Sequence, residues 1–425
     1  MSTLLKLLDI RLPILQAPMA GVSTPAMAAA VSNAGGLGAI GVGATDAETA
    51  RQMIRAVRTA SDRSFNVNVF CHRPAVRDST REAVWLSRLS PIFSQYGAVP
   101  PSGLREIYTS FVEDDAMLAM LLEERPKVVS FHFGIPAAQR IAALREAGIV
   151  LLATATNLSE AKIIASAGID GVVAQGFEAG GHRGLFDPEA LDDCLGTLAL
   201  TRLLVRALDI PVIAAGGIMD GAGIAACLLL GASAAQLGTA FVGCLESEAD
   251  AGYRVALFSA ASEHTAMTRA ISGRPARCLA NKFTALGAEV EGGAIPDYPL
   301  AYDAGKALNA AAKTAGRDSA LSGPGKVHLL LARCLLQCWS RNSDRNWSER
   351  FRVKALRVRT NRLRAERLVV LEPALERKMK NDSVEGTAGR QSYADFPPSS
   401  QCTSLASQPR MPAIKSSIAV LSPRL

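Results

Sequence analysis

The sequence lacks paired cysteines, and its hydrophobic stretches are interrupted. The eight cysteines form no CxxC motif and no metal-ligand spacing, so we expect no metal site. Scattered single thiols are typical of a reducing compartment and favour a cytoplasmic location. The most hydrophobic window, about Ile224 to Leu245, contains Gln236 and several glycines, and the Leu-rich N-terminus contains Lys6, Asp9 and Arg11. These interruptions argue against a membrane span and against an export signal.

The basic charge is confined to the C-terminal part of the chain. The net charge is +7, but the residues from Ala315 onward contain 20 basic and 9 acidic side chains. This part carries about +11, and the residues before it carry about −4. Its arginines are clustered, but it has few aromatic residues and no recognisable nucleic-acid motif. A disordered or aberrant extension is therefore favoured over an RNA- or DNA-binding segment, which remains a remote alternative.

Short apolar runs alternate with helical stretches over the first three quarters of the chain. Eight such units predict a (β/α)8 TIM barrel, because each strand of this α/β fold is followed by a helix. A doubly wound open sheet is the competing architecture, but the first run is not followed by a GxGxxG turn. The eight runs are Pro13–Pro18, Gly36–Gly43, Phe65–Phe70, Val128–Gly134, Ile149–Thr154, Gly171–Gly176, Pro211–Gly217 and Ala234–Val242.

We expect residues 1–313 to form the barrel together with a small lid or substrate domain. An insertion at about 73–126 and helices at about 245–313 would build this lid. Residues 314–425 form an atypical basic tail that does not repeat the strand-helix unit.

One strand end carries an amide, two glycines and an imidazole in a single loop. Gln175 ends the sixth apolar run, and Gly180, Gly181 and His182 follow. Barrel enzymes keep their chemistry in the loops after their strands. Histidine has the unperturbed pKa nearest to neutral pH, so His182 is the candidate for taking or giving a proton.

Two further strand ends are rich in glycine, namely Ala214–Gly217 and Gln236–Thr239. At the last two strands of a barrel, such loops predict a phosphate site, whereas for one pair alone a simple turn of the chain is equally compatible with the pattern. Gln16, at the end of the first strand, suits either the face of a flat cofactor or the core. Asn68 shares its strand face with Asn66, so it is either a ligand contact or a structural amide.

His132 lies near the end of the fourth strand, where a core position and a ligand contact are equally compatible with the pattern. Tyr298, Tyr302 and Lys306 are spaced i, i+4, i+8 and would share a helix face. That face either presents hydrogen-bond donors and a positive charge to an anionic substrate or is a solvated surface.

Taken together, these motifs resemble the nitronate monooxygenase family, and in particular its bacterial class that oxidises propionate 3-nitronate. The resemblance covers about residues 8–312. The motifs that carry it, in family order, are Gln16–Pro25 with Val31–Gly38, Asn66–Asn68, Ser130–Gly134, Ala174–Gly184, Ala214–Gly217 and Gln236–Thr239.

The resemblance implies a flavin-binding barrel that oxidises alkyl nitronates with O₂ to a carbonyl compound and nitrite or nitrate, with FMN as the cofactor and no metal. It implies His182 as the catalytic residue. The implied FMN contacts are Gln16, Asn68, Gln175, Gly180, Gly217, Gln236, Leu237, Gly238 and Thr239. The implied substrate contacts are Tyr108, His132, Tyr253, Tyr298, Tyr302 and Lys306. An FMN-dependent NAD(P)H oxidoreductase acting on a quinone or an enoyl thioester is the alternative on the same barrel.

The tail departs from this family pattern. Family members usually close with a short Ala/Leu-rich helix, whereas Arg317–Lys326 begins a segment rich in Arg, Ser, Cys and Trp. This composition is typical of translation in a shifted reading frame, so we hypothesise a frameshift near codon 317.

Overall fold

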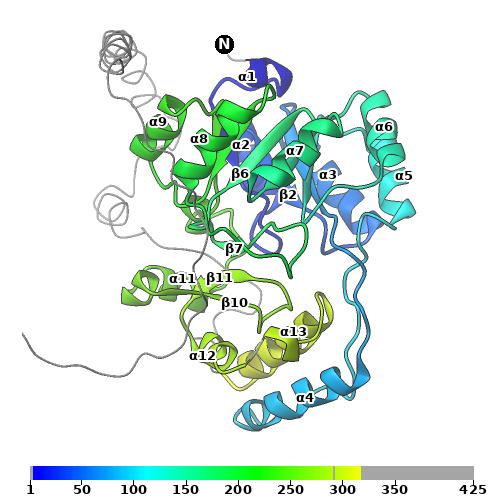
Figure 1. Ribbon diagram of the computed structural model, residues 1–425, viewed down its shortest axis with the longest axis vertical. Helices are drawn as coiled ribbons and strands as arrows, with labels where there is room; N and C mark the ends of the chain where they lie inside the picture. The colour runs from blue at the N-terminus through cyan, green and yellow to red at the C-terminus, as the bar shows by residue number, and fades with distance from the viewer. Residues whose placement is uncertain (1–2, 291, 317–425) are drawn as a thin grey trace, which may run out of the picture. The chain divides into compact units, whose positions relative to one another are not determined.

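Eight parallel strands close into a barrel in the computed structural model, which describes residues 3–290 and 292–316 (Figure 1). The strand order is β1-β9-β8-β6-β5-β4-β3-β2, and a parallel bridge between Leu15 and Leu37 joins the two ends of the sheet. The predicted TIM-barrel fold is thereby confirmed. The barrel strands are β1 (Ile14–Gln16), β2 (Gly38–Gly41), β3 (Phe65–Phe70), β4 (Val128–His132), β5 (Val150–Ala155), β6 (Gly171–Gln175), β8 (Val212–Ala215) and β9 (Ala234–Leu237).

Each predicted run overlaps one barrel strand, but the last run does not form a single strand. Within Ala234–Val242, β9 ends at Leu237 and a short helix begins at Thr239. An apolar run without alternation is compatible with either element, and Gly238 takes a helical backbone conformation that ends the strand. The helices are α1 (Thr3–Leu7), α2 (Pro25–Ala34), α3 (Ala47–Ala60), α4 (Ser79–Ser94), α5 (Asp115–Glu124), α6 (Ala138–Glu146), α7 (Leu158–Ser166), α8 (Thr197–Ala207), α9 (Gly221–Leu229), α10 (Thr239–Val242), α11 (Ala251–Leu257), α12 (Lys282–Ala288) and α13 (Leu300–Thr314), with 3₁₀ turns at η1 (Ala260–Glu263) and η2 (Gly292–Ala294).

Local sequence sets where the barrel helices begin and end. The hydroxyl of Thr24 accepts a hydrogen bond from the Met27 backbone N–H at 3.0 Å, and Pro25 occupies the first turn of α2. Gly35 ends the helix in the left-handed region at φ 98°. Asp220 caps α9 in the same way by accepting from the Gly223 N–H at 2.9 Å.

The amino-terminal end of the barrel interior is filled with apolar side chains. Leu4 and Leu8, in and just after α1, are fully buried against Leu15, Leu152 and Val173 from three barrel strands. The Leu-rich N-terminal segment therefore closes one end of the barrel. Burying these leucines stabilises the fold by roughly 1.5–3 kcal/mol for each side chain.

At the carboxyl ends of the strands, the inward-facing side chains of the same interior are polar. Two residues beyond Leu152 the inward position is Thr154, and two residues beyond Val173 it is Gln175. Successive inward-facing positions of these strands are thus apolar at the amino-terminal end of the barrel and polar at the carboxyl ends of the strands.

A second, antiparallel sheet lies next to this opening. Its order is β10 (Thr265–Thr268), β11 (Ala276–Leu279), β7 (Gly181–His182). Figure 1 shows α12 and α13 on the side of β10 and β11 away from the barrel, and α4 beside α13. Trp85 of α4, Phe283 of α12 and Leu308 of α13 are buried in one shared apolar cluster. The region 245–313, expected to be helical, therefore also supplies two strands.

The insertion expected at 73–126 divides between two apolar clusters. Its first helix, α4, belongs to the cluster of α12 and α13, whereas Met117, Met120 and Leu121 of α5 are buried in the barrel core. Glu124 of α5 also accepts hydrogen bonds from Arg51 and Arg55 of α3. We therefore propose that α5 completes the third unit of the barrel and that α4 belongs to the second domain.

Within the residues that the structure describes, no helix has both the length and the apolar character needed to cross a membrane. The predictions made for residues 317–425, including the basic extension and the shifted reading frame, lie outside the described residues.

Candidate active site

A cavity of about 530 Å³ opens where the barrel strands end, and α13 contributes part of its lining. Its lining contains thirteen of the residues singled out in the sequence: Asn68, Tyr108, His132, Gln175, Gly180, His182, Gly217, Gln236, Gly238, Thr239, Tyr298, Tyr302 and Lys306. Three others, Gln16, Leu237 and Tyr253, lie outside the lining.

These three side chains lie in the packed wall of the cavity. Gln16 donates hydrogen bonds to Ser23 Oγ at 2.8 Å and to Ala39 O at 2.9 Å, and its own oxygen accepts from the Ala39 N–H at 3.1 Å. Leu237 and Tyr253 are each 1% exposed and belong to one apolar cluster. The geometry therefore gives Gln16, Leu237 and Tyr253 a packing role behind the cavity surface.

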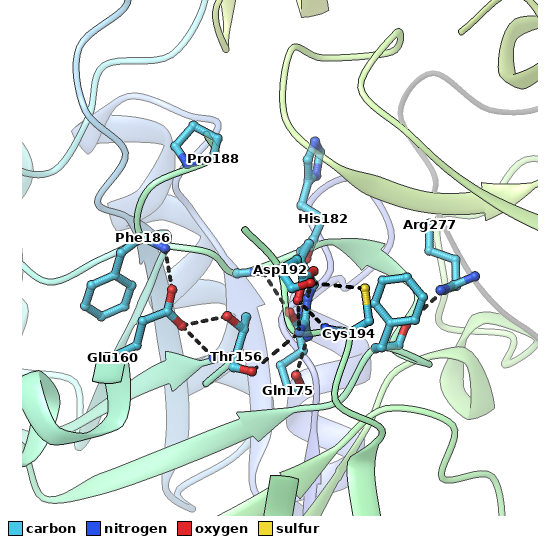
Figure 2. Close-up of polar contacts among 12 residues, drawn as sticks. Thr156, Glu160, Gln175, His182, Phe186, Pro188, Asp192, Cys194 and Arg277 are labelled. Carbon is cyan, nitrogen blue, oxygen red and sulfur yellow. Dashed lines mark hydrogen bonds and ion pairs between the residues drawn. The ribbon is translucent and has the colours of Figure 1, made fainter. Parts of the chain in front are cut away.

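The Gln175 side chain holds the loop that carries His182. Its amide oxygen accepts from the Gly184 N–H at 2.7 Å, and its amide nitrogen donates to His182 O at 3.0 Å. In Figure 2, the His182 side chain points away from Gln175 and from the other labelled polar groups. The Gln175 amide therefore holds the backbone of the glycine-containing loop in place at two positions.

A buried ion pair anchors the same loop. Arg183 Nε and Nη2 lie 2.8 Å and 2.9 Å from the two carboxylate oxygens of Asp192, and the Arg183 side chain is 1% exposed. Arg183 also donates to the carbonyl of Gln175, at the end of β6. Figure 2 shows the polar contacts of Gln175 and Asp192. A charged pair with this geometry fixes a backbone position well, because several hydrogen bonds must break together.

His182 is positioned by the second sheet as well as by the barrel loop. It pairs with Ala276 of β11, and its Nε2 lies 2.8 Å from the hydroxyl of Ser272. Ser272 is fully buried and lies ninety residues further along the chain. It carries no sequence signal of its own, because its role arises only when β7 pairs with β11.

Burial keeps both histidines of the cavity in their neutral form. Desolvation, reinforced by the nearby His132 and Arg274, lowers the pKa of His182 to about 3. Desolvation and Arg274 lower the pKa of His132 to about 4, and His132 Nδ1 lies 3.1 Å from Thr154 Oγ1. Near neutral pH both imidazoles can therefore accept a hydrogen bond or a proton but supply no positive charge.

Three tyrosines and a lysine surround one end of the cavity. The Tyr298 and Tyr302 rings lie 5.7 Å and 5.9 Å from the His182 ring, and Tyr108 lies 5.8 Å from Tyr302. Burial raises the pKa of all three phenols, so they remain protonated donors. The ammonium of Lys306 lies 4.7 Å from the centre of the Tyr108 ring.

Tyr298 reaches this group from outside the helix in which the sequence placed it. Helix α13 begins at Leu300, so only Tyr302 and Lys306 are helical. The three side chains nevertheless line the same cavity. Their convergence therefore depends on the turn before α13 as well as on helical spacing.

The glycine-rich loops leave backbone exposed on the opposite wall. Gly216 and Gly217 have φ angles of 116° and 65°, which favour glycine. A Cβ on Gly216 would lie 3.0 Å from Ala179 N and 2.8 Å from Thr197 Oγ1. Gly238 and Thr239 lie at the start of α10 and line the same cavity. The two loops thus fit a phosphate group held by backbone N–H groups.

Asn68 has its amide oriented by a neighbouring strand. Its Nδ2 donates to Ser130 Oγ at 2.9 Å and to Ser130 O at 3.1 Å. Asn66 donates to the same hydroxyl at 2.8 Å, which confirms that Asn66 and Asn68 point to the same face of β3. Ser130 and Thr154, which orient two predicted site residues, were not themselves predicted.

Comparison with known proteins agrees with this arrangement. A family model described as nitronate monooxygenase matches residues 1–334. The chain belongs to the nitronate monooxygenase family. The matched range contains the whole barrel and the second sheet.

Two curated relatives and one solved structure show how close this similarity is. A nitronate monooxygenase from Paraburkholderia phytofirmans is 64% identical over 313 residues, covering 74% of this chain and 86% of the relative. One from Pseudomonas aeruginosa is 55% identical, covering 73% of this chain and 89% of the relative. The crystal structure of a nitroalkane oxidase from Streptomyces ansochromogenes is 42% identical with a TM-score of 0.68, covering 75% of this chain and 90% of that chain.

Proposed function

We propose that this protein is an FMN-dependent nitronate monooxygenase that oxidises alkyl nitronates with O₂, with propionate 3-nitronate as the favoured substrate. The observation that carries the proposal is the convergence of His182, three protonated tyrosines and the Lys306 ammonium on one cavity next to two glycine-rich loops. Close similarity to nitronate monooxygenases supports the same reaction class.

The residues that would hold the flavin lie on the barrel side of the cavity. The glycine-rich loops at Gly216–Gly217 and Gly238–Thr239 would bind its phosphate through backbone N–H groups. Asn68 and Gln175 would meet the ring system, since both line the cavity and both are held by hydrogen bonds. Bound FMN would supply the electron-accepting chemistry that no side chain of this cavity can provide.

The chain's own residues then bind and orient the substrate. A nitronate is an anion that has already lost its α-proton, so it needs no base. The neutral imidazole of His182 would orient it, and the phenols of Tyr298 and Tyr302 would donate hydrogen bonds to it. If a neutral nitroalkane binds instead, His182 is the group placed to accept the α-proton.

Lys306 would favour a nitronate that carries a carboxylate. Its ammonium lies 4.7 Å and 5.4 Å from the ring centres of Tyr108 and Tyr302. A carboxylate at the far end of the substrate would form a charge-assisted hydrogen bond with it.

The absorption spectrum of the purified protein tests the proposal. We expect a flavin spectrum that bleaches when propionate 3-nitronate is added without oxygen and returns when O₂ is admitted. Bleaching by NADH or NADPH, with no response to nitronates, would instead support the reductase alternative. Identification of the released cofactor by mass separates FMN from other flavins.

A further inference from the structure

Arg274 is a buried cation without a carboxylate partner. It lies in the turn between β10 and β11, and it is 2% exposed. Its Nη2 donates to Leu185 O at 2.7 Å and to Phe186 O at 3.0 Å, whereas its buried Nε has no hydrogen-bond partner. No acidic group of the described residues lies within 4.0 Å of its guanidinium. A buried charge that lacks its counter-charge opposes folding, so its presence calls for a functional explanation.

One aromatic ring separates this cation from the reactive end of the cavity. The guanidinium carbon of Arg274 lies 4.4 Å from the centre of the Phe133 ring. The same ring lies 4.4 Å from the His132 ring, 5.7 Å from the His182 ring and 5.5 Å from the Tyr298 ring. Arg274 does not line the cavity itself. Its charge therefore acts on the cavity across an apolar side chain, where solvent screening is weak.

Charged groups of both signs lie near Arg274. Arg269 and Arg73 are the other nearby cations, and they pair with Glu189 at 2.6 Å and with Asp297 at 3.9 Å. Asp187 and the Tyr298 phenol are the nearby groups that favour the charged guanidinium. Although burial lowers the pKa of Arg274 to about 10, the group stays cationic near neutral pH.

We propose that Arg274 is an electrostatic positioning residue, which acts through Phe133 to make the cavity select the anionic nitronate over the neutral nitroalkane. The inference rests on the proposed function for its substrate, but its effect on the histidines can be measured without turnover. A fixed cation favours an anion placed beside His182 and disfavours a second cation there. Since both imidazoles are neutral, Arg274 and Lys306 supply the positive charge that an anionic substrate requires.

The test compares Arg274→Met, which keeps an unbranched flexible side chain without the charge, with Arg274→Lys, which keeps the charge. The matched control is Arg277→Met, because the Arg277 guanidinium lies 4.6 Å from the centre of another ring, Phe177.

The size of the expected effect follows from the distance between Arg274 and His182. The distances of both groups from the Phe133 ring show that the Arg274 guanidinium lies at most about 10 Å from the His182 ring. At that separation and an effective dielectric constant of about 20, the interaction corresponds to about one pKa unit, or about tenfold in an equilibrium constant.

Two measurements are made on each variant. Titration of the histidine side chains by NMR should show the pKa of His132 and His182 rising by about one unit in Arg274→Met but not in Arg277→Met. The ratio of kcat/KM for ethyl nitronate to that for nitroethane should fall about tenfold in Arg274→Met. Arg274→Lys should restore most of both values.

Unchanged histidine titrations and an unchanged substrate ratio in a folded Arg274→Met protein would overturn the proposal. If Arg274→Met does not fold, Arg274→Gln and Arg274→Lys provide the same comparison of an uncharged with a charged side chain. If the wild-type protein does not oxidise nitronates, the proposed function fails, and the NMR titration still decides whether Arg274 controls the histidines.

Discussion

The imidazole of His182 lines the cavity and is held there by a hydroxyl. Its Nε2 lies 2.8 Å from Ser272 Oγ, which leaves Nδ1 as the ring nitrogen that Ser272 does not engage. Burial lowers the pKa of His182 to about 3, so the ring is a neutral acceptor throughout the neutral pH range. This protonation state suits a group that orients an anion and that removes a proton only from a neutral nitroalkane.

His182→Asn should separate these two roles. We expect the variant to retain flavin, because the backbone of the loop is held by Gln175 and Arg183 rather than by the imidazole. Turnover of neutral nitroethane should fall by roughly 10²–10⁴-fold, the usual contribution of a general base. Turnover of ethyl nitronate should fall much less, and steady-state kinetics with the two substrates measures both effects. An equal loss with both substrates would contradict the role as base.

Lys306→Met should change substrate preference and leave the reaction itself intact. The methionine keeps the packing against Tyr108 and Tyr302 but removes the charge. A lost hydrogen bond to a charged group costs about 1.5–3 kcal/mol, so KM for propionate 3-nitronate should rise roughly 10–100-fold. Ethyl nitronate, which has no carboxylate, serves as the control substrate. The assignment fails if KM rises equally for both.

At the scale of elements, the loop between β8 and α9 has a glycine with a positive φ angle that lies close to Thr197 and Ala179. Gly216 has a φ angle of 116°, and its α-carbon faces Thr197 and Ala179 across a narrow gap. The loop can expose its N–H groups to a ligand only because no side chain occupies that space.

Gly216→Ala should therefore weaken flavin binding. The added Cβ would lie 2.8 Å from Thr197 Oγ1 and 3.0 Å from Ala179 N, and the φ angle would be strained. We expect the fraction of protein that retains flavin during gel filtration to fall, with a Kd raised about 5- to 150-fold for a strain of roughly 1–3 kcal/mol. Gly103→Ala is the matched control, because no atom lies within 4 Å of its Cβ position. Full flavin retention by Gly216→Ala would contradict the assignment of this loop.

At the scale of the whole molecule, the active site lies where the barrel meets the second sheet. The barrel contributes Gln175 and the glycine-rich loops to the candidate site, whereas the chain after α11 contributes Ser272, Arg274 and α13. This arrangement buries three histidines in neutral form, because His72 also has its pKa lowered to about 4 by desolvation and by Arg274.

The buried histidines should make folding sensitive to mild acid. Their pKa values are about 4, 4 and 3 in the folded protein and about 6.5 when exposed, so the unfolded state binds protons first as pH falls. Their contribution to stability is complete above about pH 6.5 and declines below it, by about 2 kcal/mol for each histidine at pH 5. Urea unfolding of the flavin-free protein at pH 7 and pH 5 measures this change.

Two variants isolate the cause of this pH dependence. His72→Leu should remove about a third of the difference between pH 7 and pH 5, since it deletes one of three comparable buried groups. His264→Gln, at an exposed position, should leave the difference unchanged. A free energy of unfolding that is equal at both pH values would show that the histidines are not buried in neutral form.

The parts of the fold that depend on short-range patterns were predictable. The strand alternation of Asn66 and Asn68, the glycines after β8 and the Asp220 cap each depend on neighbours within a few residues, and the structure confirms their placement. Ser272 and Arg274 were not predictable, because their importance depends on contacts with a loop ninety residues earlier. Tyr253 matched a motif position, but packing places it in the core behind the cavity.

The sequence by itself determined the eight barrel strands, the polar positions at their ends and the family, because these follow from local periodicity and from motifs in a fixed order. Only the tertiary structure decided which groups are charged in the cavity. Pairing of β7 with β11 brings Ser272 and Arg274 to His182. Burial there removes the water that would otherwise stabilise the protonated imidazoles and screen the guanidinium. The pKa of a side chain depends on everything packed around it, and that environment is assembled from segments far apart in the chain.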